Sequence, residues 1–462
     1  VGEKGVNPSE ILAVTFSRKG ADEMNERLEA ILGKNNGARV GTFHSLALEI
    51  LLKEKPHYRA WPHAPDTKNK YHFCVKDAVG FRGIKRPGSS RRGWKEADVA
   101  LIDQYIGFCK ASMARPHSDK AIEIAKDLRE AHGYAKADPT MLNLAYEKAE
   151  ELALEREILT FDEMLLQAVE MLQSDENMRV RWASRWSWVL QDEAQDQNLP
   201  QLIMGELLAQ DHRNYLMVGD PAQTIYTWRG AQPSKLLGFE SKWGAHVVRM
   251  GRNYRCGRQI ISAANNVLHS MDPSTRLDMD MICELDVDAD LTGTLYTDLD
   301  DEAEGIAARI QEALADGQEP RNISILYRVN AQSRAPEEAL IGARIPYRII
   351  GGTNFYERRE VKLLLAYLRT AEGRGSLDDA EACLNAPFRY LGKAFQRKFR
   401  EALKVARRQA RKAKGGDNWQ AVIRETCKRE RVQYRQEQSA QEWAQIIESL
   451  RDRIRAQSTE QQ

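Results

Sequence analysis

Two adjacent carboxylates that follow a hydrophobic run are the side chains of this sequence best placed to do chemistry. The run at 186–190 has β-type residues, and the string QDEAQD follows it, with Asp192 next to Glu193. In open α/β sheets, ligands bind beyond the carboxyl ends of the strands. There Asp192 can hold Mg²⁺ through water, while Glu193 can orient and deprotonate an attacking water molecule. An isolated acid pair is more often a solvated strand end, so the neighbouring segments decide between the two interpretations.

A second segment carries polar and aromatic side chains after another apolar run. Its string is GDPAQTIYTWRGA, at residues 219–231. The neutral side chain of Gln223 can donate and accept hydrogen bonds. A neighbouring strand would bring this side chain near a terminal phosphate. Tyr226, Trp228 and Arg229 follow, and aromatic rings beside a cation suit stacking on unpaired bases, worth about 1–3 kcal/mol per base. The alternative is that the two aromatic side chains belong to a core.

Strand–turn–helix repeats are the elements that must position these residues. Apolar runs at 11–16 and 38–42 are each followed by a polar switch and a helical pattern, at 21–32 and 44–52. This alternation predicts a parallel sheet with helices on its faces. The same sheet is expected to continue with a helix at 161–172 and strands at 186–190 and 215–218.

The rest of the chain is predicted to hold a helical insertion, a second α/β domain and a helical tail. Pro and Gly punctuate residues 56–93, and helical patterns without a clear strand follow. The insertion has helical patterns at 98–111, 118–131 and 140–157. The second domain has expected strands at 246–250, 293–297, 323–327 and 347–350, with helices at 253–268, 302–314 and 335–341.

Strings spread in order over residues 11–389 resemble the motifs of the UvrD/Rep-type (PcrA-like) superfamily 1 DNA helicases. They are TFSRKGADEM at 15–24, GTFHS at 41–45, DEAQD at 192–196, VGDPAQTIYTWRGA at 218–231, NYRC at 253–256, YRVNAQSR at 327–334, IPY at 345–347 and GGTNFYER at 351–358.

The resemblance implies an α/β fold with two RecA-like parallel-sheet domains of the P-loop NTPase type and mainly helical insertions. The expected division is 1–55 with 159–244 for the first, ATP-binding domain, 56–158 for an inserted helical subdomain, 245–372 for part of the second RecA-like domain, and 373–462 for part of a helical, basic accessory subdomain.

Roles in ATP hydrolysis follow from the resemblance. Asp192 would hold the Mg²⁺ of Mg-ATP, Glu193 would be the catalytic base and Gln223 would sense the γ-phosphate. Tyr254 would stack on the adenine, and Arg255 would act as an arginine finger, a device worth ~10³–10⁵ in rate. The implied cofactors are therefore ATP and Mg²⁺, and the implied activity is that of an ATP-dependent DNA helicase.

Roles in DNA binding are implied as well. Phe16, Tyr226 and Trp228 would stack on bases of single-stranded DNA, with movement 3′ to 5′ and strand separation at single-strand/duplex junctions. For Arg328 and Asn330, capping of a strand end is an equally open alternative. Further implied contacts to the strand come from Thr42, His44 and Arg229. The family implies DNA repair or replication without choosing between them.

One motif of the family is missing from the 462 residues. No G-x-x-x-x-G-K-[ST] string occurs, because Gly33-Lys34 and Gly392-Lys393 lack both the upstream glycine and the following hydroxyl residue. Without that loop the β- and γ-phosphates lose their main anchor. The family's late T-x-H-x-x-K-G-L-E and V-A-x-T-R-A segments are missing too.

Two explanations of these missing motifs compete. Since the sequence starts at Val1 rather than Met, we expect a helicase that is incomplete at both ends and does not hydrolyse ATP at a useful rate as given. The alternative is a non-catalytic DNA-binding or regulatory module that has lost ATPase activity. A third interpretation, the helicase part of a helicase–nuclease, has no support in these residues.

Composition excludes several classes of protein. With 68 Lys+Arg against 67 Asp+Glu the net charge is +1, so no overall basic field points to nucleic acid. Hydrophobic residues make up 42%, which is too many for a disordered chain, and no apolar run is long enough to span a membrane. The six cysteines are scattered, which argues against structural zinc or disulfides and suits a reducing cytoplasm.

The tail has a local basic bias, with one acid, Glu401, in the same stretch. Contact with duplex DNA and a solvated helix balanced by neighbouring acids are equally open interpretations. The basic residues are Arg389, Lys393, Arg397, Lys398, Arg400, Lys404, Arg407, Arg408, Arg411, Lys412 and Lys414.

Overall fold

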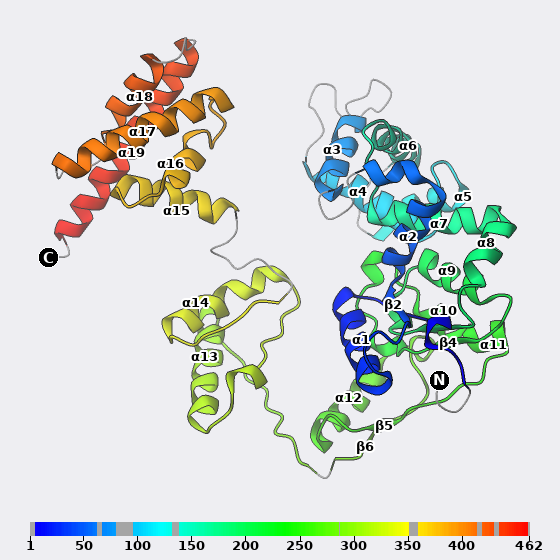
Figure 1. The fold of residues 1–462 in the computed structure, drawn as a ribbon. Coiled ribbons are helices and arrows are strands. Elements are labelled where there is room, and N and C mark those ends of the chain that lie inside the picture. The colour runs from blue at the N-terminus through cyan, green and yellow to red at the C-terminus, as the bar shows by residue number, and fades with distance from the viewer. Residues whose placement is uncertain are drawn as a thin grey trace. The chain divides into compact units, whose positions relative to one another are not determined.

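The chain folds into two compact units, Val1–Leu291 and Thr292–Gln462. The first unit contains two hydrophobic cores and the second contains one. Figure 1 shows the course of the chain in the computed structural model. The structure describes residues 5–61, 67–79, 96–131, 138–285, 287–350, 359–413, 418–428 and 434–460.

A four-stranded parallel sheet forms the centre of the first unit, with strand order β2-β1-β3-β4. Ala13 of β1 lies opposite Val40 of β2 and Leu190 of β3. The near-continuous burial of β1 is typical of a parallel strand covered on both faces. The four strands predicted for this domain are confirmed, with slightly different ends: β1 (Ile11–Thr15), β2 (Arg39–Thr42), β3 (Trp188–Gln191) and β4 (Tyr215–Met217).

Helices cover this sheet and begin where the sequence supplies N-caps. The Ser17 side chain accepts from the backbone N–H of Gly20, 3.0 Å away, at the start of α1. Trp182 and Phe43 are almost completely buried in the shared core. The helices are α1 (Arg18–Leu32), α2 (Phe43–Glu54), α7 (Phe161–Ser174), α8 (Glu176–Ala183), α9 (Leu199–Ala209), α10 (Pro233–Leu237) and α11 (Phe239–Trp243).

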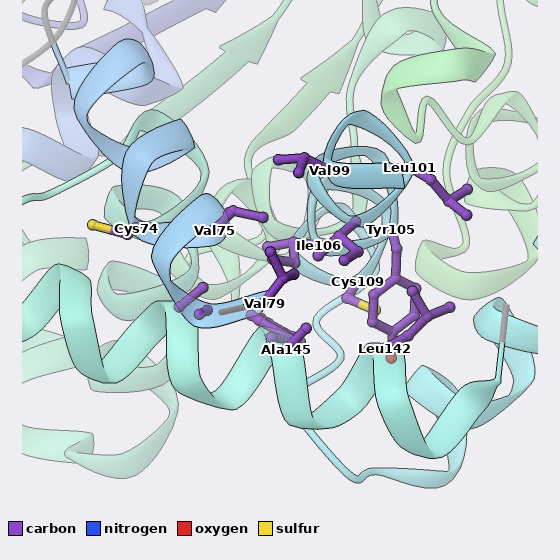
Figure 2. Close-up of a cluster of buried hydrophobic side chains, with 14 of the residues drawn as sticks. Cys74, Val75, Val79, Val99, Leu101, Tyr105, Ile106, Cys109, Leu142 and Ala145 are labelled. Carbon is purple, nitrogen blue, oxygen red and sulfur yellow. The ribbon is translucent and has the colours of Figure 1, made fainter. Parts of the chain in front are cut away.

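Between α2 and α7 the chain forms a helical subdomain with its own core. Val79, Ile106 and Ala145 gather where its helices meet (Figure 2). The predicted helices are confirmed, and one more helix, α3, lies in the stretch punctuated by Pro and Gly. The subdomain contains α3 (Thr67–Val79), α4 (Glu96–Ala111), α5 (Asp119–Ala131) and α6 (Pro139–Glu155).

The second set of strands was predicted wrongly. None of the described residues in 246–250, 293–297, 323–327 or 347–350 belongs to a strand. A strand needs a hydrogen-bonded neighbour and a face to bury, and here the side chains of Val248, Leu295 and Leu326 are 71%, 101% and 91% exposed. The parallel pair found instead is β5 (Arg252–Asn253) with β6 (Ile282–Cys283), beside α12 (Arg258–Ser270).

The second unit is mainly helical, and its core includes the aromatic side chains of Phe395, Phe399, Trp419 and Trp443. Trp443 packs edge-on against Phe399 and Trp419, with ring centres 5.4 and 5.3 Å away. Among the described residues, no helix combines the length and apolar character needed to cross a membrane. The helices are α13 (Leu299–Ala315), α14 (Arg334–Gly342), α15 (Arg359–Glu372), α16 (Leu377–Leu384), α17 (Lys393–Ala413), α18 (Trp419–Lys428) and α19 (Tyr434–Glu460).

Candidate nucleotide and nucleic-acid site

The acid pair lies at the point where the strand order of the sheet reverses. The backbone N–H of Asp192 donates to the carbonyl of Val14, 2.9 Å away, so the pair follows β3 directly beside the end of β1. The chain runs outward from β1 to β2 on one side and from β3 to β4 on the other. Ligands of open α/β sheets bind at such a switch point. The prediction that the acids sit beyond a strand end is confirmed.

Glu193 occupies a strained turn. Its φ of +50° is in the left-handed region, which is uncommon for a residue other than glycine and occurs often at functional sites. Its side chain is exposed, and Gln195 Nε2 donates to Oε2 at 2.7 Å. The next residue, Ala194, donates its N–H to the carbonyl of Val218 at 2.9 Å. The turn therefore fixes the carboxylate while leaving it open to solvent.

Gln195 joins the loops that follow β3 and β4, a role that the sequence did not reveal. The residue is 1% exposed, and its Oε1 accepts from the N–H of Asp220 at 3.1 Å. A Cβ on Gly219 would lie 2.5 Å from the same Oε1, so the close approach requires glycine there. The only sequence signal was the position of Gln195 between the acids of the string DEAQD.

Gln223 and Asp196 lie on these two loops. Gln223 is exposed, and its Nε2 donates to Asp220 Oδ2 at 2.9 Å. Burial raises the pKa of Asp196; the N–H of Ile225, which donates to its Oδ1, opposes the shift, and the charge of Glu193 adds to it. The predicted acid pair and Gln223 thus come from adjacent loops at one edge of the sheet.

The carboxylate of Asp192 suits the Mg²⁺ of a nucleotide better than a protein-only metal site. No side chain among the described residues hydrogen-bonds to it. No group of three or more His, Cys, Asp or Glu in the described part of the chain could hold a metal ion. Mg²⁺ at nucleotide sites needs only one or two carboxylates, with water and phosphate oxygens as the other ligands.

Three aromatic side chains meet at the same edge. The rings of Phe16 and Tyr226 are stacked with centres 4.6 Å apart, and Trp228 lies 6.1 Å from Tyr226. Trp228 is 58% exposed, which rules out a core role for it, and its Nε1 donates to the carbonyl of Ile225 at 3.1 Å. The Arg229 guanidinium lies 5.6 Å from the centre of the Trp228 ring. We call Phe16, Tyr226 and Trp228 the aromatic cluster.

Thr42 is the last residue of β2 and His44 lies in the first turn of α2, at the same edge of the sheet, but their environments differ. The His44 ring meets the Phe161 ring edge-on, with centres 5.3 Å apart. Burial lowers the pKa of His44 to about 4; Asp162 opposes the shift, and the charges of Arg229 and Arg18 add to it. Thr42 is 7% exposed, and its Oγ1 caps α2 by accepting from the N–H of Ser45.

The remaining predicted residues lie on exposed turns. Tyr254 and Arg255 are exposed, and Asn253 Oδ1 accepts from the N–H groups of Arg255 and Cys256, both at 2.9 Å. Arg328 and Asn330 belong to the second unit, where both are exposed. The Arg328 N–H donates to Gln332 Oε1 at 3.0 Å in the turn before α14. The string at 351–358 lies outside the described residues.

The basic tail is less uniform than its sequence. Arg389 is only 9% exposed and donates to the carbonyls of Cys383 and Leu384, so it supports a loop rather than a surface. Arg400 is paired with Asp378 and Glu381 of α16, as the interpretation of a balanced helix requires. Lys414 lies outside the described residues, as do the side chains of Arg411 and Lys412. Four basic residues on α17 are exposed: Lys393, Arg397, Lys404 and Arg408.

Two family models match consecutive parts of the chain. Residues 1–244 match the UvrD/REP helicase N-terminal domain and residues 248–461 the UvrD-like helicase C-terminal domain. ATP-dependent DNA helicase Rep of Escherichia coli is 33% identical over 408 residues, 86% of this chain and 56% of Rep. ATP-dependent DNA helicase PcrA of Bacillus subtilis is 29% identical over 397 residues, 85% of this chain and 51% of PcrA.

DNA helicase II of Escherichia coli is 33% identical over 396 residues, 84% of this chain and 51% of that helicase. The chain thus spans about half the length of the curated relatives it matches. The first of the two matched regions contains the four-stranded parallel sheet, and the second follows it along the chain. The chain belongs to the UvrD/Rep family of helicases.

Proposed function

We propose that the chain is part of an ATP-dependent motor that moves along single-stranded DNA, 3′ to 5′, and separates duplex DNA. The observation that carries this proposal is the aromatic cluster, which lies at the same sheet edge as the acid pair Asp192 and Glu193. A nucleotide and a strand bound at that edge would share the loops after β3 and β4. The names of Rep and PcrA, ATP-dependent DNA helicases, support the same activity.

In the proposed nucleotide chemistry each side chain has a separate task. Asp192 would hold Mg²⁺, which would neutralise phosphate charge, while Glu193 would accept a proton from the attacking water. Gln223 contacts the γ-phosphate from the neighbouring loop. Tyr254 stacks on the adenine, and Arg255 offers its guanidinium to the phosphates from the turn that Asn253 holds.

In the proposed DNA path the aromatic cluster stacks on bases, and polar groups contact the strand. Arg229, beside Trp228, supplies positive charge to phosphates. The neutral ring of His44 and the capping hydroxyl of Thr42 line the end of β2. Arg328 and Asn330, which belong to the second unit, are separate proposed contacts to DNA.

We further propose that the exposed face of α17 contacts the duplex at a single-strand/duplex junction. Lys393, Arg397, Lys404 and Arg408 recur at helical spacing and are exposed on this helix. Phe388 and Tyr390, 70% and 51% exposed, lie in the loop just before it. Positive charge of this kind binds the phosphate backbone in a salt-dependent way. The exposed face supports the duplex interpretation, whereas the pairing of Arg400 supports the balanced helix.

Replacing Trp228 with alanine tests the proposed function. Because one exposed stacking platform is lost, the dissociation constant for a fluorescein-labelled oligo(dT) should rise about 5- to 150-fold in an anisotropy titration. The matched control is Phe73→Ala, which removes an aromatic side chain of equal exposure, 58%, from α3. Unchanged affinity in Trp228→Ala, or an equal loss in Phe73→Ala, would contradict the assignment.

A further inference from the structure

A partly buried cluster of charges, with Lys110 and Glu163 at its buried centre, joins the inserted subdomain to α7. The Lys110 side chain, 2% exposed in the last turn of α4, places Nζ 2.8 Å from Glu150 Oε1 of α6 and 3.1 Å from Glu163 Oε2 of α7. Arg115, just after α4, lies with Nη1 3.0 Å from Glu163 Oε1. It also binds Glu170 of α7 through both Nε and Nη2, at 2.8 and 2.6 Å. We call these five residues the charge cluster.

Hydrogen bonds fix the carboxylates of the charge cluster. Gln167 Nε2 donates to Glu163 Oε1 at 2.9 Å, and Tyr58 donates its hydroxyl to Gln167 Oε1 at 2.6 Å. Tyr71 of α3 donates its hydroxyl to Glu150. Burial alone would raise the pKa of Glu163, but the charges of Lys110 and Arg115 outweigh it and lower the pKa to about 2. Glu163 is therefore ionised and paired at neutral pH.

On two sides, residues next to the charge cluster contact residues of the proposed DNA path. Ala111 follows Lys110, and a Cβ on Gly230 would lie 2.5 Å from the Ala111 Cβ. Gly230, with φ +82°, ends the turn that carries Trp228. On the other side, Phe161 lies two positions before Glu163 on α7 and packs edge-on against His44.

A gain in folding stability does not by itself explain why these charged residues occur together. Replacing a buried ion pair with apolar groups of similar volume is often neutral or stabilising, whereas ionic geometry can select one arrangement of packed elements. Here the arrangement in question is the end of α4 against α7. An α4 end that shifted would move Ala111 away from Gly230 or push against it, and the exposed Trp228 would move with that turn.

We propose that Glu163, through Lys110 and Arg115, is a positioning residue for single-stranded DNA: it fixes the end of α4 so that Ala111 supports the Gly230 turn behind Trp228. Glu163 does not touch DNA in this role. The inference rests on the proposed function, because it assigns the support of the same aromatic cluster. It also gives the inserted subdomain a direct mechanical link to the DNA path.

The test is a double-mutant cycle in the full chain, with labelled oligo(dT) as the probe. The affinity is measured at a temperature well below the unfolding temperature of each variant. Glu163→Gln keeps the shape and removes the charge, and Gly230→Ala disturbs the turn without touching the charge cluster. Each should weaken binding about tenfold, within the range of coupling between packed groups. Because both substitutions act on one turn, their effects should not add. The dissociation constant of the double variant should be close to the higher of the two single-variant values.

Asp211→Asn is the matched control, since it weakens the pairing of another buried cation, Arg179 of α8, which is 3% exposed. It should lower the unfolding temperature and leave the affinity unchanged. The proposal is overturned if Glu163→Gln behaves like this control, or if Gly230→Ala binds normally. Should Glu163→Gln not fold, Arg115→Gln takes its place in the cycle, because it removes one of the two cations that Glu163 binds. Failure of the proposed function is seen separately, as normal binding by Trp228→Ala.

Discussion

At the scale of single residues, burial decides the charge that a side chain carries at this edge of the sheet. His44 follows β2 beside Phe161, and burial lowers its pKa to about 4 against the partial opposition of Asp162. The imidazole is therefore neutral at physiological pH and offers one donor and one acceptor rather than a positive charge. The cations of this region are Arg18 and Arg229, whose charges also disfavour protonation of His44.

His44 makes a pH-dependent contribution to stability that can be measured. Its folded pKa, about 4, lies below the ordinary 6.5, so the unfolded chain takes up the proton first as the pH falls. The contribution is full above pH 6.5 and declines toward pH 4, by up to about 3 kcal/mol. Urea unfolding of the first unit at neutral and at acidic pH measures this contribution. The decrease in unfolding free energy between the two pH values should be smaller in His44→Gln than in the wild type. Equal losses in the two proteins would contradict the assignment.

At the scale of elements, short loops are held by side chains that bind backbone groups. Gln195 does this for the loops after β3 and β4, and Asn253 does it for the turn that carries Tyr254 and Arg255. In the second unit, Arg389 Nη1 donates to the carbonyls of Cys383, Leu384 and Pro387 at 3.2–3.3 Å, and its Nη2 donates to the Tyr367 hydroxyl at 2.8 Å. This guanidinium fixes the loop between α16 and α17.

Replacing Arg389 with methionine should destabilise the second unit. The buried carbonyls would lose a charged donor, which costs about 2–3 kcal/mol, and Arg389→Lys should not restore it because one ammonium group cannot reproduce the fork of donors. Urea unfolding measures the effect. Arg424→Met, at an exposed position on α18, should change the unfolding free energy by less than about 0.5 kcal/mol. A similar small change in Arg389→Met would show that the loop is held by other contacts.

At the scale of the whole molecule, the net charge of +1 conceals opposite local charges. The acid pair lies at the edge of the sheet in the first unit, and the exposed lysines and arginines of α17 lie in the second. A near-neutral total therefore says little about DNA binding, since association depends on local fields rather than on their sum. The three separate cores likewise give each part of the chain its own source of stability.

The phosphate-loop string that is missing from the 462 residues bears on ATP hydrolysis by this chain. Without a glycine-rich cradle and its lysine, Mg-ATP lacks its main anchor even though Asp192 and Glu193 are in place. We expect phosphate release from ATP in the presence of oligo(dT) to stay at background, and Glu193→Gln to be indistinguishable from the wild type. Robust turnover that Glu193→Gln abolishes would contradict this expectation.

Much of the first unit could be predicted from its sequence because the signals there are local. Apolar runs flanked by polar switches located β1 to β4, and the helical periodicity located α4, α5 and α6. Since the carboxyl ends of parallel strands meet at one edge, the acid pair and the aromatic segment could also be placed together. The strands expected after residue 245 failed because pairing is not local, and the segments have no strand neighbour among the described residues.

The sequence by itself determined which residue types follow each strand of the first sheet, and with them the chemistry open to that edge. Only the tertiary structure decided that Gln195 joins two loops, that Arg389 is buried rather than part of a basic surface, and that Glu163 links α7 to the end of α4. The physical reason is that periodicity records the environment of a residue along one element. The partners of a buried polar group come from distant elements, and only packing brings them within hydrogen-bonding distance.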